Sequence, residues 1–182
     1  MSLVRIRHAD NNDAAALAEF GARTFYEAYI DSLDAERLVP FIESTFGVDS
    51  TRAELTTPST TFLIAEAGGE MAGYSMVNIG DAEEPVDGDN PAELARIYVS
   101  EEWIGRGVGA ELMRSSLEHA KGRGCDVIWL GVWEHNRRAI DFYQRWGFRA
   151  IGQTSFRFGD ELQTDILMQR PTIDSDTMQT AT

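Results

Sequence analysis

The stretch from Glu93 to Arg123 constrains the fold more than any other part of the sequence. Its first residues include Ile97, Tyr98 and Val99, which are β-branched or aromatic and therefore typical of a strand. Apolar residues then return at helical spacing over 111–123, at Leu112, Met113, Leu117 and Ala120. The stretch therefore predicts a strand, a turn and a helix in that order.

The turn between this strand and this helix contains Gly105, Gly107 and Gly109. Glycine allows the backbone to approach a ligand closely, and a helix N-terminus offers unpaired N–H groups to an anion. The turn therefore predicts a phosphate or pyrophosphate site, although many such turns only end a strand. It is not a Walker A motif, because no Lys-Ser/Thr follows the last glycine, and its spacing differs from the dinucleotide fingerprint.

The length of 182 residues predicts one domain with a full core, and the apolar fraction of 43% is ordinary for a globular protein. No apolar run approaches the roughly 20 residues of a membrane helix, and the N-terminus has no apolar signal core. The single cysteine, Cys125, begins an apolar run and is expected to be a buried structural thiol. These features predict a cytoplasmic protein.

The formal net charge is −14, and the loop over 80–92 has acidic residues and no basic one. This balance argues against nucleic acid and anionic membranes as partners. It favours a cationic substrate. An acidic chain with Lys121 as its only lysine could equally reflect the organism's salt or genome composition, and the acidic loop could simply be solvated.

The periodicity along the chain predicts a mixed α/β sheet whose middle strand leads into the glycine turn. A polar tail is expected from Pro171 to Thr182. The expected strands are 3–7, 60–66, 71–78, 93–99, 127–133, 148–158 and 162–169; the expected helices are 13–29, one beginning after Asp34, 50–55, 111–123 and 136–146.

Two motifs resemble those of the GCN5-related N-acetyltransferase (GNAT) family, and the order of strands and helices resembles that family's domain over residues 3–170. The turn matches the family's Gln/Arg-x-x-Gly-x-Gly/Ala pattern at Gly107 and Gly109, but Ile104 replaces the polar first residue. The segment from Asn136 to Phe148, with Tyr143 in its helix, resembles the second signature. The resemblance implies one domain with a mixed, mostly antiparallel sheet flanked by helices. It also implies acetyl-CoA, whose pantetheine arm lies between central strands that diverge.

Acyl transfer to an amine requires a proton acceptor, stabilisation of the carbonyl oxygen and protonation of the leaving thiolate. The resemblance implies Glu93 as the base, the Val99 N–H as the donor to the thioester carbonyl, and Tyr143 as the general acid. Alternatively, Glu93 only begins a strand, water accepts the proton, and Tyr143 packs in the core. The implied acetyl-CoA contacts are Ile97, Tyr98, Val99, Gly105, Arg106, Gly107, Val108, Gly109, Ala110, Asn136 and Tyr143.

Segments 26–29, 72–74, 127–136 and 155–165 are similar to bacterial spermidine/spermine N-acetyltransferases. This similarity implies a small primary amine, first of all a polyamine, as substrate. A peptide N-terminal amine and a non-catalytic acyl-CoA-binding regulator remain alternatives. A homodimer is expected by analogy, and no metal is expected because the histidines lack ligand spacing. The candidate substrate contacts are Tyr26, Tyr29, Glu83, Glu84 and Trp133.

Overall fold

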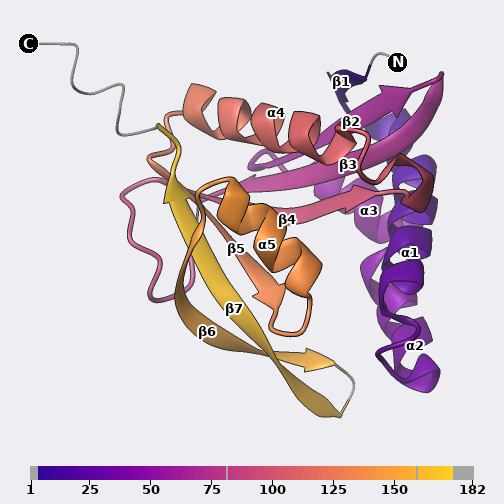
Figure 1. Ribbon diagram of the computed structural model, residues 1–182. Coiled ribbons are helices and arrows are strands. Elements are labelled where there is room, and N and C mark those ends of the chain that lie inside the picture. The colour runs from indigo at the N-terminus through magenta and orange to yellow at the C-terminus, as the bar shows by residue number, and fades with distance from the viewer. Residues whose placement is uncertain (1–3, 81, 159, 174–182) are drawn as a thin grey trace, which may run out of the picture.

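The computed structural model describes residues 4–80, 82–158 and 160–173, which form a single sheet with helices on both faces (Figure 1). The strands are β1 (Arg5–His8), β2 (Thr60–Ala67), β3 (Glu70–Ile79), β4 (Pro91–Val99), β5 (Val127–Trp133), β6 (Arg149–Phe158) and β7 (Glu161–Pro171). The α-helices are α1 (Ala14–Tyr29), α2 (Ala35–Thr45), α3 (Val48–Leu55), α4 (Val108–Gly122) and α5 (Arg137–Arg145).

The strand order in the sheet is β1-β2-β3-β4-β5-β7-β6, and every neighbouring pair is antiparallel except β4 and β5. The two hairpins, β2–β3 and β6–β7, lie on either side of the parallel pair. A mixed, mostly antiparallel sheet in one domain was predicted from the sequence, and the structure confirms it.

The parallel strands β4 and β5 pair only at their first residues. The register joins Pro91 to Val127, Ala92 to Ile128 and Glu93 to Trp129. Beyond this point residues 94–99 pair only with β3, and residues 130–133 only with β7. We call the region between these two unpaired stretches the β4–β5 fork. The register thus confirms the divergence of central strands that the family resemblance implied.

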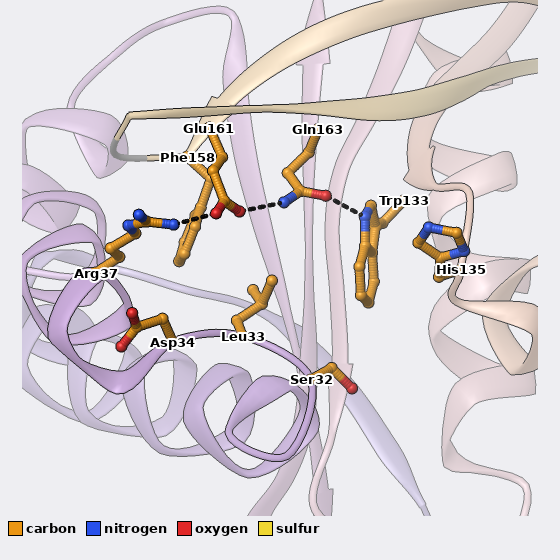
Figure 2. Close-up of a pocket in the computed structure, with 9 residues that line it drawn as sticks. All are labelled: Ser32, Leu33, Asp34, Arg37, Trp133, His135, Phe158, Glu161 and Gln163. Atoms are coloured by element: carbon orange, nitrogen blue, oxygen red, sulfur yellow. Dashed lines mark hydrogen bonds and ion pairs between the residues drawn. The ribbon is translucent and has the colours of Figure 1, made fainter.

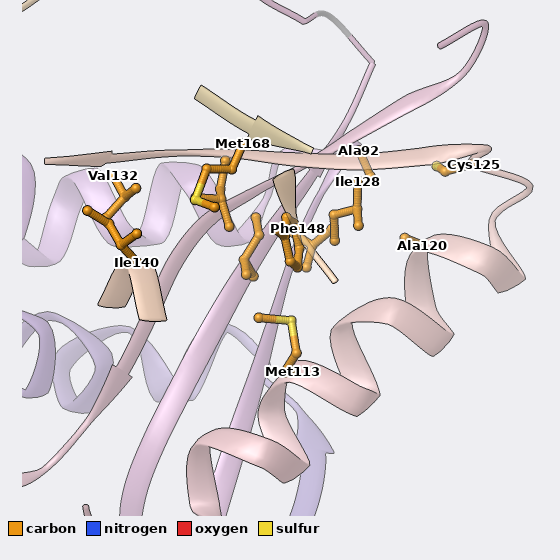
Figure 3. Packing of buried hydrophobic residues seen from close by; sticks show 12 residues of the cluster. Ala92, Met113, Ala120, Cys125, Ile128, Val132, Ile140, Phe148 and Met168 are labelled. Atoms are coloured by element: carbon orange, nitrogen blue, oxygen red, sulfur yellow. The ribbon is translucent and has the colours of Figure 1, made fainter. Parts of the chain in front are cut away.

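Alternating side chains assign the helices to opposite faces of the sheet. On β2, Phe62 and Ile64 pack in a cluster with Leu17 and Phe20 of α1, whereas Leu63 and Ala65 pack with α4. On the α4 face, Met113 and Ala120 pack in one cluster with side chains of β3, β4, β5 and β7, and Ile140 of α5 lies beside Val132 (Figure 3). Cys125 is buried here, as predicted.

Several element boundaries differ from those predicted, and two of these differences bear on the site and the tail. Helix α4 begins at Val108, inside the glycine run, because Gly105 and the N-cap Gly107 are left-handed whereas Gly109 has ordinary helical geometry. Strand β7 continues to Pro171, and the Thr172 hydroxyl donates to the Cys125 carbonyl at 2.6 Å. Pro171 and Thr172 therefore belong to the fold and not to the predicted tail. Residues 174–182 of that tail lie outside the described residues.

None of the helices in the described ranges is long and apolar enough to cross a membrane.

Candidate functional site

The glycine turn requires two left-handed residues, which explains its composition. Gly105 has φ of 76° and Gly107 has φ of 91°, both in a region that disfavours residues with a Cβ atom. Gly109 has ordinary helical geometry and lies beside Phe142 of α5 and Val99 of β4. A Cβ atom on Gly109 would lie 3.7 Å from each of these two side chains. The turn therefore brings β4, α4 and α5 together.

The N-terminus of α4 presents a row of unpaired donors. The first internal hydrogen bond of the helix runs from the Glu111 N–H to the Gly107 carbonyl at 3.0 Å. The N–H groups of residues 107–110 have no acceptor within the described residues. Arg106 is exposed and lies over Trp103, with 5.5 Å from Cζ to the ring centroid. Four successive donors and a cation suit a phosphate group.

The backbone of β4 alternates between β3 and the fork. The Ser100 N–H donates to the Ala72 carbonyl at 3.1 Å, and this register places the backbone groups of Tyr98 towards β3. Ile97 and Val99 therefore direct their N–H and C=O groups towards the fork, where β5 does not pair with them. The two residues predicted to pair with the pantetheine arm are thus suitably placed, whereas Tyr98 offers it no main-chain group.

Glu93 lies at the closed end of the fork. The Asn78 side-chain amide donates to Glu93 Oε2 at 3.0 Å, and Thr60 in turn donates to Asn78 Oδ1 at 2.9 Å. Glu93 Oε1 has no partner among the residues that the structure describes. The indole of Trp129, the register partner of Glu93, is buried, and its Nε1 also lacks an acceptor in the described part of the chain. The closed end therefore holds an oriented carboxylate with one free oxygen.

Tyr143 is half-buried on α5, between Phe142 and Phe148. Burial raises the pKa of the Tyr143 hydroxyl well above its usual value, and the neighbouring Tyr29 raises it further. The hydroxyl makes no hydrogen bond with any other described residue. It therefore stays protonated at neutral pH and has its proton available for a ligand.

Asn136 connects the two sides of the site. Its Oδ1 accepts from the Ala139 N–H at 3.2 Å, which caps α5, and its Nδ2 donates to the Tyr29 hydroxyl at 3.1 Å. Burial is the main cause that raises the pKa of Tyr29. The sequence predicted Asn136 and Tyr29 separately, as cofactor and substrate contacts. The structure shows them bonded to each other, with both side-chain groups of Asn136 engaged.

Trp133 borders a pocket of about 450 Å³ on the side of α2 and the β6–β7 hairpin. The Trp133 Nε1 donates to Gln163 at 2.9 Å, Gln163 donates to Glu161 at 3.3 Å, and Glu161 pairs with Arg37 of α2 (Figure 2). The pocket is lined by Ser32, Leu33, Asp34, Arg37, Trp133, His135, Phe158, Glu161 and Gln163.

The other predicted substrate contacts have few or no interactions with the rest of the site. Tyr26 is 41% exposed on α1 and Glu84 is exposed in the acidic loop, and neither has a contact with a described site residue. Glu83 interacts electrostatically with Asp165 of β7. Asp165, Gly131 and Gln163 were not predicted as site residues. The alternation along Trp129-x-Gly131-x-Trp133 places Gly131 with the two tryptophans on one face of β5 and was a signal for Gly131 alone, since Asp165 and Gln163 lie on β7.

No group of three or more His, Cys, Asp or Glu side chains in the described ranges could hold a metal ion. That the protein needs no metal stays a prediction.

Residues 15–148 match the model of the acetyltransferase (GNAT) family. The chain belongs to this family. It is therefore an acetyl-CoA-dependent N-acetyltransferase, as the two motifs predicted. An N-acetyltransferase of unassigned function from Lactobacillus delbrueckii subsp. lactis is 31% identical, over 93% of this chain and 98% of that protein.

The similarity to proteins with an assigned substrate is narrower. The spermine/spermidine N(1)-acetyltransferase of Bacillus subtilis is 28% identical, but over only 48% of this chain and 59% of that protein. The crystal structure of the PaiA N-acetyltransferase of Thermoplasma acidophilum, which is in complex with coenzyme A, superposes with a TM-score of 0.78 at 20% identity, covering 93% of this chain and 99% of that one. The latter similarity shows the same fold.

Proposed function

We propose that this GNAT enzyme acetylates a primary amine of a small cationic acceptor, with a polyamine as the first candidate. The observation that carries the proposal is the pair of incompletely satisfied carboxylates on the face of the sheet opposite α4. Glu93 has one free oxygen, and Asp165 has no hydrogen-bond or ion-pair partner among the described residues. A cationic amine would neutralise such charges, and the net charge of −14 would attract it.

The residues on the other side of the fork fit acetyl-CoA, which supplies an activated thioester acyl group. The unpaired N–H groups of residues 107–110 and the side chain of Arg106 suit its phosphates. The outward-facing backbone groups of Ile97 and Val99 suit a main-chain-like pairing with the pantetheine amides. Val108 and Ala110 contribute through their amides, and Gly105 through its left-handed turn.

In this proposal each of three residues performs one part of the transfer. Glu93 lies six residues before Val99 on β4, roughly 20 Å along the strand, so it takes, through a chain of waters, the proton that the amine nitrogen loses as it bonds to the acetyl carbon. The Val99 N–H donates to the thioester oxygen as charge develops there. Tyr143 gives its proton to the sulfur as the carbon–sulfur bond breaks, and is reprotonated from solvent. The raised pKa of Tyr143 keeps that proton in place until the thiolate leaves.

The test is the release of free CoA thiol from acetyl-CoA with a panel of acceptors. The panel contains spermidine, spermine, putrescine, an aminoglycoside, amino acids and short peptides. Saturable release with polyamines supports the proposal, and mass spectrometry of the product identifies the acetylated nitrogen. Release only with peptides would indicate that the acceptor is a peptide N-terminal amine and not a polyamine. Tight acetyl-CoA binding with no release for any acceptor would indicate a regulator that binds acyl-CoA without turnover.

A further inference from the structure

Gly131 is exposed in the middle of a central strand. Its neighbours on β5, Leu130 and Val132, are 1% and 6% exposed and face the α4 side of the sheet. Trp129 and Trp133 lie two positions before and after Gly131, so all three face the opposite side. The missing side chain at Gly131 therefore leaves an open place in the sheet surface between two tryptophans, beside the β4–β5 fork.

The carboxylate of Asp165 reaches over this open place. Asp165 on β7 is the register partner of Trp133. A Cβ atom placed on Gly131 would lie 3.4 Å from Asp165 Oδ2 and 3.8 Å from its Cβ. Within the described residues the Asp165 carboxylate accepts no hydrogen bond and pairs with no cation. Gly131 and Asp165 thus form a shallow recess, the Gly131 recess, with a carboxylate at its edge.

The surroundings of the Gly131 recess favour a cation. Burial raises the pKa of the Asp165 carboxyl, and the charge of Glu83 raises it further. No positively charged group of the described residues is among the causes that shift this pKa. Tyr29 is near enough for Asp165 to raise the pKa of its hydroxyl, and its ring lies 5.7 Å from that of Trp133. A partly buried carboxylate without a partner is unfavourable, and aromatic faces beside it attract ammonium groups.

We propose that Asp165 determines acceptor specificity by binding an ammonium group of the substrate that is not acetylated. The inference rests on the proposed function, and it assigns a binding residue to the second positive charge of the substrate. Trp129, the partner of Glu93, lies two residues before Gly131, which separates the two carboxylate positions by roughly 7 Å along β5 and by one strand spacing of roughly 5 Å across the sheet. One aliphatic spacer of a diamine spans such a separation. Glu93 then serves the reacting nitrogen and Asp165 the other nitrogen, with Glu83 adding negative charge.

The experiment compares putrescine with butylamine, which has the same carbon chain but lacks the second ammonium. For each amine, kcat/KM is measured with the natural protein and with Asp165→Asn, Gly131→Ala and Asp160→Asn. The Gly131→Ala methyl meets Asp165 at an ordinary contact distance, so this variant should fold while filling the recess. Asp160→Asn removes the same charge from the exposed turn of the same hairpin.

We expect Asp165→Asn to lower kcat/KM for putrescine by roughly tenfold or more, and to leave that for butylamine within about twofold. Gly131→Ala should show the same pattern, and Asp160→Asn should change neither value appreciably. An equal fall with both amines, or no fall with putrescine, would overturn the assignment of Asp165.

A binding measurement separates failure of this inference from failure of the proposed function. Putrescine is titrated calorimetrically into the natural protein and Asp165→Asn, each saturated with CoA, where no transfer occurs. Binding that is lost in Asp165→Asn supports the recess even if another acceptor is the one acetylated. If the natural protein acetylates putrescine and Asp165→Asn does so equally well, only the inference fails. If the natural protein neither binds nor acetylates putrescine, spermidine or spermine, both fail.

Discussion

The Asn78 side-chain amide donates a hydrogen bond to Glu93 Oε2 at 3.0 Å, directly across the β3–β4 pair. Because Asn78 also accepts from Thr60, its amide cannot rotate without losing one of the two bonds. This arrangement fixes the orientation of the carboxylate at the closed end of the fork. It leaves Oε1 as the oxygen that can take a proton.

Replacing Glu93 with Gln should lower kcat by about 10²–10³-fold with little change in acetyl-CoA affinity, because the amide has the same shape but cannot accept the proton. Steady-state kinetics, with acetyl-CoA affinity from calorimetry, makes the check. Asn78→Ala is the comparison variant, since it frees the carboxylate without removing it and should cost less. An unchanged kcat in Glu93→Gln would assign proton removal to water alone.

Replacing Tyr143 with Phe should lower kcat by about tenfold or more and leave acetyl-CoA affinity nearly unchanged, since only the hydroxyl is lost. Because burial raises the pKa of Tyr143, the natural enzyme should keep its activity up to a pH above the ordinary tyrosine value of about 10, within the limits of its stability. Single-turnover kinetics with a saturating amine separates the transfer step from product release. Full kcat in Tyr143→Phe would show that this tyrosine is only a packing residue.

Replacing Gly107 with Ala should weaken acetyl-CoA binding and destabilise the fold by about 1–2 kcal/mol, because the N-cap of α4 has φ of 91°. Calorimetry with CoA and urea denaturation measure the two effects. Gly122→Ala is the control, since Gly122 ends the same helix with no atom near its Cβ position. That variant should keep CoA affinity and be no less stable. Equal CoA affinity in Gly107→Ala would argue against phosphate binding at the turn.

The Arg7–Asp13 ion pair predicts a pH dependence of stability. Arg7 donates to Asp13 at 2.7 and 2.8 Å, and this pairing lowers the pKa of the Asp13 carboxyl. A lowered pKa means that the contribution is fully present above the unfolded-state pKa of about 3.9 and is lost as pH falls through the folded-state pKa. Asp13→Asn should therefore cost about 1–2 kcal/mol at neutral pH and progressively less in acid.

Urea denaturation at neutral pH and well below the pKa of free aspartate measures this dependence. Asp49→Asn is the matched control, because the Asp49–Arg52 pair is exposed and should contribute less than about 0.5 kcal/mol. Because the capping bond from the Asp10 N–H, at 2.8 Å, also lowers the pKa of Asp13, a loss in Asp13→Asn that did not shrink in acid would contradict any role of the ionised carboxylate.

Much of the architecture was determined by local sequence. The order of strands and helices, the β2–β3 and β6–β7 hairpins and the Asp34 cap of α2 follow from side-chain periodicity and turn residues, which act over a few positions. The glycines at 105 and 107 could likewise be assigned to a ligand turn, because a left-handed backbone is a local requirement.

Only the tertiary structure decided which distant residues form the acceptor side. Asn136 and Tyr29 are 107 positions apart, and their hydrogen bond requires α1 and α5 to meet. Asp165 lies over Gly131 only because β7 inserts between β5 and β6 in the sheet. Strand register and insertion order depend on the packing of whole faces, which sequence spacing does not encode. The sequence thus determined the fold and the glycine turn, and the sheet order determined the position of Asp165, which we propose binds the amine.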